Sequence, residues 1–219
     1  LAIRYTHTNL FGHLTRLDLE ILAGWAQLPN PWATYQDGPV LSLEPRFTKK
    51  GLLEKHLLWE LTPRFDVDVQ EGYQYYSPAN RLGVSRWFAG RYQVGLSHNI
   101  RYVDFFATTD LLDTQASLLG RDFRDPFLLG YLELQGTAWF TDSILKPQNG
   151  VVLEGSFTVA AQYLGSDYDF TRILGGVRGY WRPWDRLQIA SQLETGMIFP
   201  FGANPGAPLT HKLYLGGGN

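Results

Sequence analysis

Hydrophobic and polar side chains alternate along most of the chain, in segments of about ten residues separated by turn-forming residues. Residues 16–21 read Arg-Leu-Asp-Leu-Glu-Ile, and residues 57–62 read Leu-Leu-Trp-Glu-Leu-Thr. Because successive side chains of a β-strand point to opposite faces of a sheet, each such segment predicts a strand with one apolar and one polar face. The pattern predicts about ten strands, at residues 2–9, 14–26, 40–47, 55–66, 79–87, 92–103, 130–142, 150–161, 170–181 and 187–198.

The expected connections between these strands alternate in length. Short turns are expected at residues 10–13, 48–53, 88–91, 143–149 and 182–186. Longer stretches are expected at residues 27–38, 67–78, 104–128, 162–169 and 199–219. Tight turns at one rim and long loops at the other are typical of barrels in a bacterial outer membrane.

Two further features of the predicted strands suit a membrane. Several strands reach the roughly 9 to 11 residues that a tilted strand needs to cross a bilayer. No stretch approaches the roughly 18 to 20 uninterrupted apolar residues of a membrane helix, so strands alone would do the crossing. Aromatic residues gather near the strand ends, as in an interfacial girdle. They are Trp25, Phe47, Trp87, Phe88, Tyr102, Phe105, Trp139, Phe140, Tyr180, Trp181 and Trp184.

The alternation also assigns residues to the two faces of the sheet. A soluble β-sandwich or barrel would alternate in the same way with its polar face outward, so periodicity alone does not choose between the two. In the membrane interpretation the lipid-facing residues include Leu17, Leu19, Ile21, Leu57, Trp59, Leu61, Leu187, Ile189 and Leu193. The polar wall that faces the lumen includes Arg16, Asp18, Glu20, Glu44, Arg46, Glu60, Arg101, Glu154, Arg172, Arg178 and Glu194.

Composition and charge exclude several classes of protein. The chain is 44% hydrophobic and 15% aromatic, which excludes a disordered polar chain. Its 19 Lys and Arg residues nearly balance 21 Asp and Glu residues, and no block of like charge suggests a nucleic-acid-binding face. Cysteine is absent, so disulfides, thiolate nucleophiles and zinc–cysteine sites are excluded.

Candidate chemistry is sparse in this sequence. No Gly-x-Ser-x-Gly elbow is present, and the glycine run near residue 216 lacks the Gly-Lys-Ser/Thr of a phosphate-binding loop. We therefore expect no catalytic residue, no metal and no cofactor, and a protein that is not an enzyme. The many carboxylates and arginines are expected to pair across neighbouring strands. The histidines lack the spacing of a metal site; they are His7, His13, His56, His98 and His211.

Both ends of the sequence suggest a partial chain. Position 1 is Leu, no secretory signal follows it, and the sequence stops at Asn219 inside a Gly-rich stretch. We expect one partial barrel domain over residues 1–219.

Three stretches together resemble the barrel of the outer-membrane protein assembly and translocation superfamily. Its members include the barrel-assembly insertase, the translocation-and-assembly-module barrel and the two-partner-secretion transporters. Residues 9–12, Asn-Leu-Phe-Gly, are similar to the family's Asn-Leu-x-Gly turn, and the similarity continues through Glu-Pro-Arg-Phe at 44–47. Residues 141–150 resemble its Asp-rich, Pro-x-x-Gly periplasmic turn, without the usual Arg-Asp pair after the first Asp. Residues 211–219 are similar to the run before its Val-Arg-Gly-Phe/Tyr signature.

The resemblance implies an all-β, antiparallel transmembrane barrel of the outer-membrane type, with about ten of an expected sixteen strands present. The long sixth extracellular loop would begin at about residue 199, fold back into the lumen and be cut at 219. Periplasmic turns would contain Asn9, Gly12, Asp142, Pro147 and Gly150. The approach to the family signature would be Gly216, Gly217, Gly218 and Asn219.

By the same resemblance, the barrel would assist the insertion or translocation of polypeptides at the outer membrane of a Gram-negative-type envelope. Its implied partners are outer-membrane lipid, client outer-membrane or secreted polypeptides, and periplasmic domains or accessory subunits, with no nucleic acid. Two alternatives stay open. One is a passive outer-membrane channel or transporter barrel, and the other is the membrane-anchoring barrel of a fusion whose catalytic domain lies outside this chain.

Overall fold

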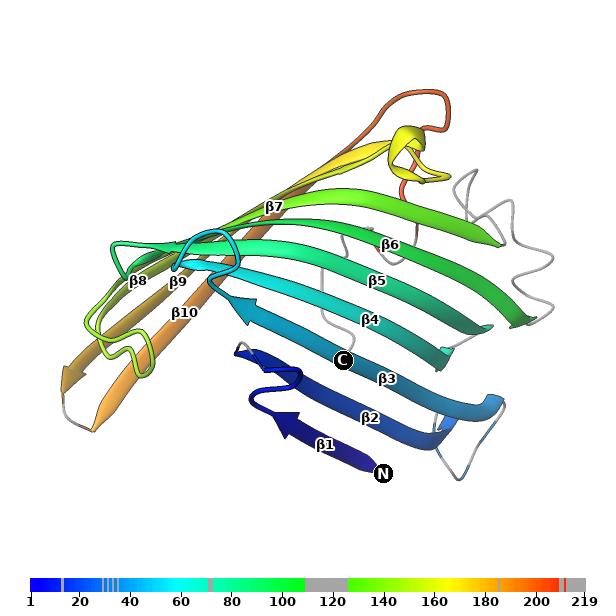
Figure 1. The fold of residues 1–219 in the computed structure, drawn as a ribbon, viewed down its shortest axis with the longest axis horizontal. Coiled ribbons are helices and arrows are strands. Elements are labelled where there is room, and N and C mark those ends of the chain that lie inside the picture. The colour runs from blue at the N-terminus through cyan, green and yellow to red at the C-terminus, as the bar shows by residue number, and fades with distance from the viewer. Residues whose placement is uncertain are drawn as a thin grey trace.

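The computed structural model describes residues 1–12, 14–28, 30, 32, 34, 36–70, 73–108, 126–184, 186–208 and 211. Almost all of them belong to strands or to the connections between strands (Figure 1). Among the described residues, no helix is both long and apolar enough to cross a membrane. The elements are β1 (Ala2–His7), β2 (Thr15–Leu28), β3 (Gln36–Lys50), β4 (Leu57–Gln70), β5 (Tyr73–Phe88), β6 (Tyr92–Thr108), β7 (Phe127–Thr141), β8 (Gly150–Ala160), the short 3₁₀ helix η1 (Gln162–Leu164), β9 (Phe170–Trp184) and β10 (Leu187–Pro200).

The strands form one 10-stranded sheet in which each strand pairs antiparallel with its neighbour in the sequence. Figure 1 shows that this sheet is curved and twisted, so that β10 runs at a steep angle to β3. In the described part of the chain, β1 and β10 do not pair with each other, and the sheet is open along these two edges. The predicted all-β, antiparallel architecture of a partial barrel is confirmed.

Each predicted strand overlaps one observed strand, but the long loop expected at residues 67–78 is wrong. Strand β4 continues to Gln70 and β5 begins at Tyr73. The reason is local, because Val67 and Val69 continue the alternation of β4 and tyrosines with a high strand propensity open β5. The strands after β1 have 11 to 17 residues, and all of them except β8 are longer than predicted.

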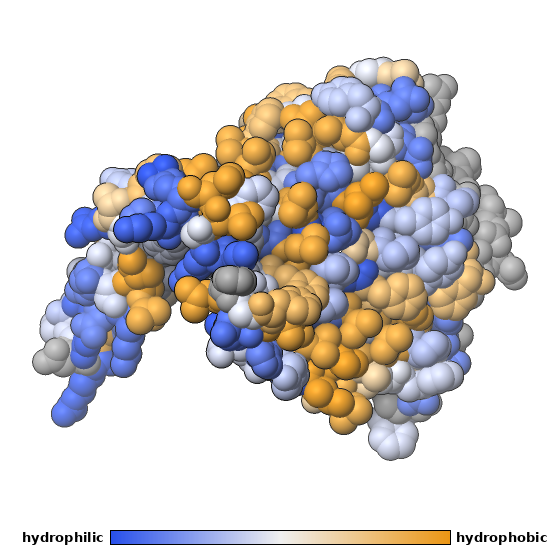
Figure 2. All heavy atoms as spheres, viewed as in Figure 1, coloured by the Kyte–Doolittle hydropathy of each residue, from blue (hydrophilic) through white to orange (hydrophobic). Residues whose placement is uncertain are grey.

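The strand register places hydrophobic side chains in rows on one face, which we call the apolar face. One row crosses the last four strands, where Leu134 pairs with Phe157, Phe157 with Ile173, and Ile173 with Met197. These four side chains are 44% to 61% exposed. Figure 2 shows hydrophobic side chains spread over much of the visible surface. A contiguous exposed surface of this kind requires apolar surroundings, as a bilayer supplies.

The opposite face, which we call the polar face, is covered at one end by the segments that follow β8 and β10. Tyr168 and Ala207 from these segments are buried in a cluster with polar-face side chains of four strands: Val103, Phe127, Leu129, Ala160 and Phe170. The segment after β8 also abuts the edge of β7, where a Cβ on Gly130 would lie 1.9 Å from the carbonyl oxygen of Leu164. These contacts fix the position of the connections at this end of the sheet.

Candidate functional site

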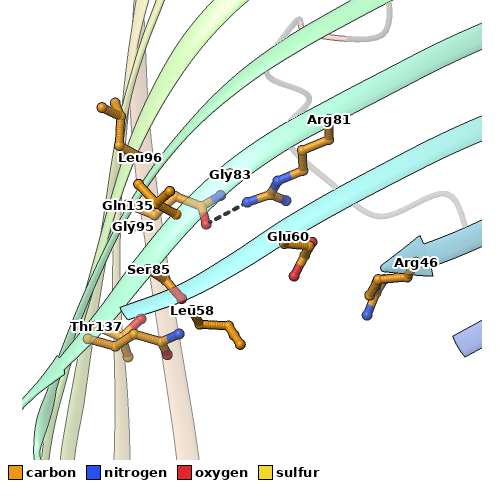
Figure 3. Close-up of a pocket in the computed structure, with 12 residues that line it drawn as sticks. Arg46, Leu58, Glu60, Arg81, Gly83, Ser85, Gly95, Leu96, Gln135 and Thr137 are labelled. Carbon is orange, nitrogen blue, oxygen red and sulfur yellow. Dashed lines mark hydrogen bonds between the residues drawn. The ribbon is translucent and has the colours of Figure 1, made fainter. Parts of the chain in front are cut away.

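The polar face is the concave side of the sheet, and cavities open on it. One cavity of about 330 Å³ is lined by Arg46, Glu60, Arg81 and Gln135, among others. A second, of about 420 Å³, shares the first three of these residues and extends to Arg101 on β6. Figure 3 shows the side chains of Arg46, Glu60 and Arg81 entering the same space, with Arg81 donating a hydrogen bond to Gln135. This face can hold water and polar ligands.

On β1 to β4 the arginines of the polar face are paired with carboxylates. Arg4 of β1 reaches Glu20 of β2 at 2.7 Å. The next pairs follow along the sheet at the same distance: Arg16–Asp18, Arg46–Glu44 and Arg64–Asp66. Arg64 also lies 3.6 Å from Glu44 and so connects neighbouring pairs on β3 and β4.

The pair on β1 and β2 is open to solvent, with 79% of the Arg4 side chain and 49% of the Glu20 side chain exposed, whereas only 8% of the Asp66 side chain is exposed. Exposed ion pairs contribute about 0–1 kcal/mol each to stability. Their main effect is therefore on the surface itself, which is strongly hydrated but close to electrically neutral. Such a wall attracts water without retaining a particular charged group.

On β8 to β10 the predicted wall residues other than Arg172 are also partnered. Arg178 of β9 pairs with Glu154 of β8, the strand beside it. Glu194 of β10 accepts a hydrogen bond from Gln192. The centre of the sheet differs, because in the described part of the chain Arg81, Arg101 and Arg172 form no ion pair.

The described residues after β10 return over the polar face. Gly206, Ala207, Pro208 and His211 are buried there. The His211 ring packs edge-on against Tyr131 at 5.2 Å and against Phe170 at 5.9 Å. Burial, and then the positive charges of Arg172 and Arg101, lower the pKa of His211 to about 4. At neutral pH this histidine is uncharged.

The turn between β7 and β8 is organised by one carboxylate. Asp142 Oδ1 accepts hydrogen bonds from the backbone N–H groups of Ser143, Gln148 and Asn149 at 2.9, 2.9 and 3.2 Å. The bonds from Gln148 and Asn149 are the largest cause of the lowered pKa of Asp142. The turn ends at Gly150, whose φ of 120° favours glycine.

The turn between β7 and β8 contacts the ends of β9 and β10, next to the turn that joins these two strands. The carbonyl of Pro147 accepts a hydrogen bond from the Gln188 side chain at 2.8 Å, and Asn149 Oδ1 accepts one from the Arg182 N–H at 3.0 Å. In the turn after β1, Asn9 Oδ1 accepts a hydrogen bond from the Leu14 N–H at 3.0 Å, and the Gly12 N–H bonds back to the Asn9 carbonyl at 3.3 Å. The structure therefore places the residues predicted for these two turns in turns. That the turns face the periplasm stays a prediction.

The strand register brings every predicted wall residue to the polar face. The predicted lipid-facing residues lie on the apolar face, except that Leu187 precedes a register shift and its side is not set by the alternation. Sequence reasoning missed Arg4, Arg64, Asp66 and Arg81, which also belong to the polar face. Their period-2 position relative to the chosen residues was a usable signal.

Metal chemistry finds no support in the residues that the structure describes, where no group of three or more potential ligands comes together. His13 lies outside the described residues. The glycine-rich approach predicted at Gly216, Gly217, Gly218 and Asn219 also lies outside them.

Comparisons with known proteins agree with this geometry. A sequence model of the Omp85 superfamily domain matches residues 43–219. The crystal structure of BamA from Haemophilus ducreyi lacking POTRA domains 1–3 is similar to this chain, with a TM-score of 0.66 and 11% sequence identity. The similarity covers 99% of this chain and 43% of that one, so this chain spans less than half of that length. A search of curated protein sequences found no match. At so low an identity, the structural likeness establishes the fold alone.

Proposed function

The chain belongs to the Omp85 superfamily, and we propose on that basis that it assists the insertion or translocation of polypeptides at the outer membrane. It is an outer-membrane chain that crosses the bilayer with β-strands. The observation that carries the proposal is the match of the family domain to residues 43–219. The two unlike faces of the sheet support it, because one suits lipid and the other suits a hydrated polypeptide.

The paired wall suits a polypeptide that passes along it. An extended chain presents N–H and C=O groups that need water or polar partners throughout. The polar face offers both, and its charges on β1 to β4 are already matched within the sheet. Along β1 to β4 a passing segment is therefore hydrated without being held by a strong, unpaired charge.

The partners follow from the same division of surfaces. We assign outer-membrane lipid to the apolar face and client polypeptides to the polar face. Periplasmic domains or accessory subunits would meet the rim that carries the turns at Asp142 and Asn9. We further propose that the segment after Pro200 begins the sixth extracellular loop and that the polar face lines the lumen. We assign no enzymatic step to this chain.

The test is a folding assay with the complete protein that carries this chain, reconstituted into liposomes. A urea-unfolded outer-membrane protein is added as client, and its folding is followed by heat-modifiable migration on a gel. For a translocated client, protection from external protease is measured instead. We expect faster client folding, or more protected client, than in liposomes that hold an unrelated porin at the same protein-to-lipid ratio.

A passive channel would give a different result. Its polar cavities would conduct ions in a planar bilayer, but the client would fold or enter no faster than with the porin. That outcome would refute the insertion or translocation function and favour the channel.

A further inference from the structure

Three arginines at the centre of the polar face differ from those on either side. Arg81, Arg101 and Arg172 come from β5, β6 and β9 and form no ion pair with any described residue. The polar contacts that they make are with neutral groups. Arg81 bonds to Gln135 at 3.3 Å, and Arg101 bonds to Ser77 at 2.6 Å and stacks over Tyr75. Among the described residues, their positive charges therefore have no acidic partner.

The three arginines lie around Tyr131 of β7. Arg81 and Arg101 line the same cavity as Tyr131. Arg172 lies opposite Thr158, which in turn lies opposite Glu133, two residues from Tyr131. Arg81 and Arg101 approach from the β5 side and Arg172 from the β9 side, as the pairing of β7 with both β6 and β8 requires. Glu133 and Glu60 are carboxylates of the same face, and neither forms an ion pair with a described arginine. The cluster is thus net positive.

Several polar atoms of this cluster are buried and have no hydrogen-bond partner among the described residues. They include Nε of Arg81, Nε of Arg172 and Oγ1 of Thr158. Thr158 is 0% exposed and lies directly opposite Arg172 in the β8–β9 register. A buried donor without a partner costs free energy, so a ligand that accepts a hydrogen bond from such a donor is favoured. Beside them, the cavity of about 420 Å³ contains Arg81, Arg101 and Tyr131.

From these observations we propose that Arg81, Arg101 and Arg172 form a binding site for side-chain carboxylates of an acidic polypeptide segment inside the barrel. A carboxylate has two oxygens that match the two parallel N–H groups of a guanidinium. The inference rests on the proposed function for the identity of the ligand. A lipid headgroup is a poor candidate, because the cluster lies on the concave face, opposite the apolar face that suits lipid.

The site would give the wall a selective step. Along β1 to β4 a passing chain meets matched charges, whereas at the centre an acidic residue gains three cationic partners. Acidic segments would pause at this point, and neutral or basic ones would not. Charge-assisted hydrogen bonds contribute more than neutral ones, so the preference is measurable.

The experiment uses the complete protein in detergent micelles at neutral pH and about 50 mM salt, where exposed charges are only partly screened. The probe is fluorescein-labelled hexaglutamate, and its binding is followed by fluorescence anisotropy. The double variant R81Q/R172Q is compared with the control R4Q/R16Q, which removes the same charge from arginines of the same face that are already paired. Heat-modifiable migration shows that each variant is folded.

We expect R81Q/R172Q to weaken binding by at least about tenfold and the control to change it by less than about twofold. If the double variant does not fold, the single variant R172Q is measured, and a loss of at least about threefold supports the site. Equal weakening by the control would overturn the proposal, and so would unchanged binding by the double variant. Displacement of the probe by hexaglutamine would also overturn the proposal. The same holds if inorganic phosphate displaces the probe as effectively as unlabelled hexaglutamate does.

This assay is independent of client folding. A protein that binds hexaglutamate through these arginines but accelerates no client would refute the proposed function and leave the site standing. A protein that accelerates client folding but does not bind the probe would refute only the site.

Discussion

Acidification should release the segment that carries His211 from the polar face of the sheet. His211 is only 8% exposed and packs against Tyr131 and Phe170. Burial, together with Arg172 and Arg101, lowers its pKa from 6.5 to about 4. Because the docked state disfavours the protonated ring, protonation shifts the equilibrium toward the undocked state.

The size of the effect follows from the pKa difference. One pKa unit corresponds to about 1.4 kcal/mol, so the fall from 6.5 to about 4 amounts to about 3 kcal/mol of docking free energy. The pKa of His211 is lower in the docked state than in the undocked state, so docking is favoured at high pH and weakened at low pH. Docking is fully stabilised above pH 6.5, weakens as the pH falls from 6.5 to about 4, and changes little below that.

Cysteine labelling can measure this release, because the sequence contains no cysteine of its own. In A207C the thiol replaces a side chain that is 5% exposed, whereas in A203C it replaces an exposed one. The ratio of the two maleimide labelling rates cancels the pH dependence of the thiol chemistry. We expect this ratio to be constant above about pH 6.5 and to rise by about tenfold per pH unit down to about pH 4.

The variant H211F is the matched control, since it keeps an aromatic ring and removes the titrating group. Its labelling ratio should stay level over the same pH range. The reasoning is refuted if the wild-type ratio does not rise between pH 6.5 and 4, or if H211F rises as much as the wild type. Heat-modifiable migration at each pH distinguishes release of the segment from unfolding of the barrel.

Four further outcomes are expected. L19R, on the apolar face, should cost roughly 2–4 kcal/mol in urea unfolding from lipid vesicles and E20Q clearly less; equal costs would contradict the assignment of the faces. D142N should speed hydrogen exchange at the Gln148 N–H, which donates a hydrogen bond to the Asp142 carboxylate. Acidification through the lowered pKa of Asp142 should do the same, because the ionised carboxylate that stabilises the turn is lost as the pH falls through that pKa. Unchanged exchange in D142N would show that Asp142 does not hold the turn together. G130A should expose the η1 segment to protease because its Cβ meets the Leu164 carbonyl at 1.9 Å, whereas G136A, with nothing within 4 Å, should not; the same cleavage in both would disprove the contact. Residues 1–219 expressed alone should give no protease-resistant, heat-modifiable monomer, because unpaired backbone groups at two strand edges cost several kcal/mol each in lipid; such a monomer would show that the sheet closes without further strands.

Sequence periodicity was most informative where one face of a strand differs clearly in polarity from the other. Around Leu19 and Leu61 the period of two identified both the strand and the side of each residue. It was least informative at residues 67–78, where tyrosines and polar residues near the strand ends resembled a loop. A strand that leaves the apolar part of a membrane loses the polarity contrast on which the prediction depends, although its ladder of hydrogen bonds continues.

The pairing of charges could not be obtained in the same way. Alternation placed Arg16, Arg46 and Arg101 on one face, but it did not say which of them has a carboxylate within reach. Register decides this, because a shift of one residue changes every cross-strand neighbour. It places Arg4 opposite Glu20 on the neighbouring strand and leaves Arg101 with Ser77 and Tyr75, whereas Arg46 pairs with Glu44 two residues away on its own strand.

The amino-acid sequence by itself determined the class of this protein: an all-β chain with one apolar and one polar face, without cysteine, suited to an outer membrane. These properties follow from local chemistry, since each depends on residue type and on positions two apart. Only the tertiary structure decided the length of the strands near residue 70, the burial of His211 and the grouping of Arg81, Arg101 and Arg172 around Tyr131. These features join residues far apart in the chain, and they exist only once curvature and register bring five strands and a returning segment together.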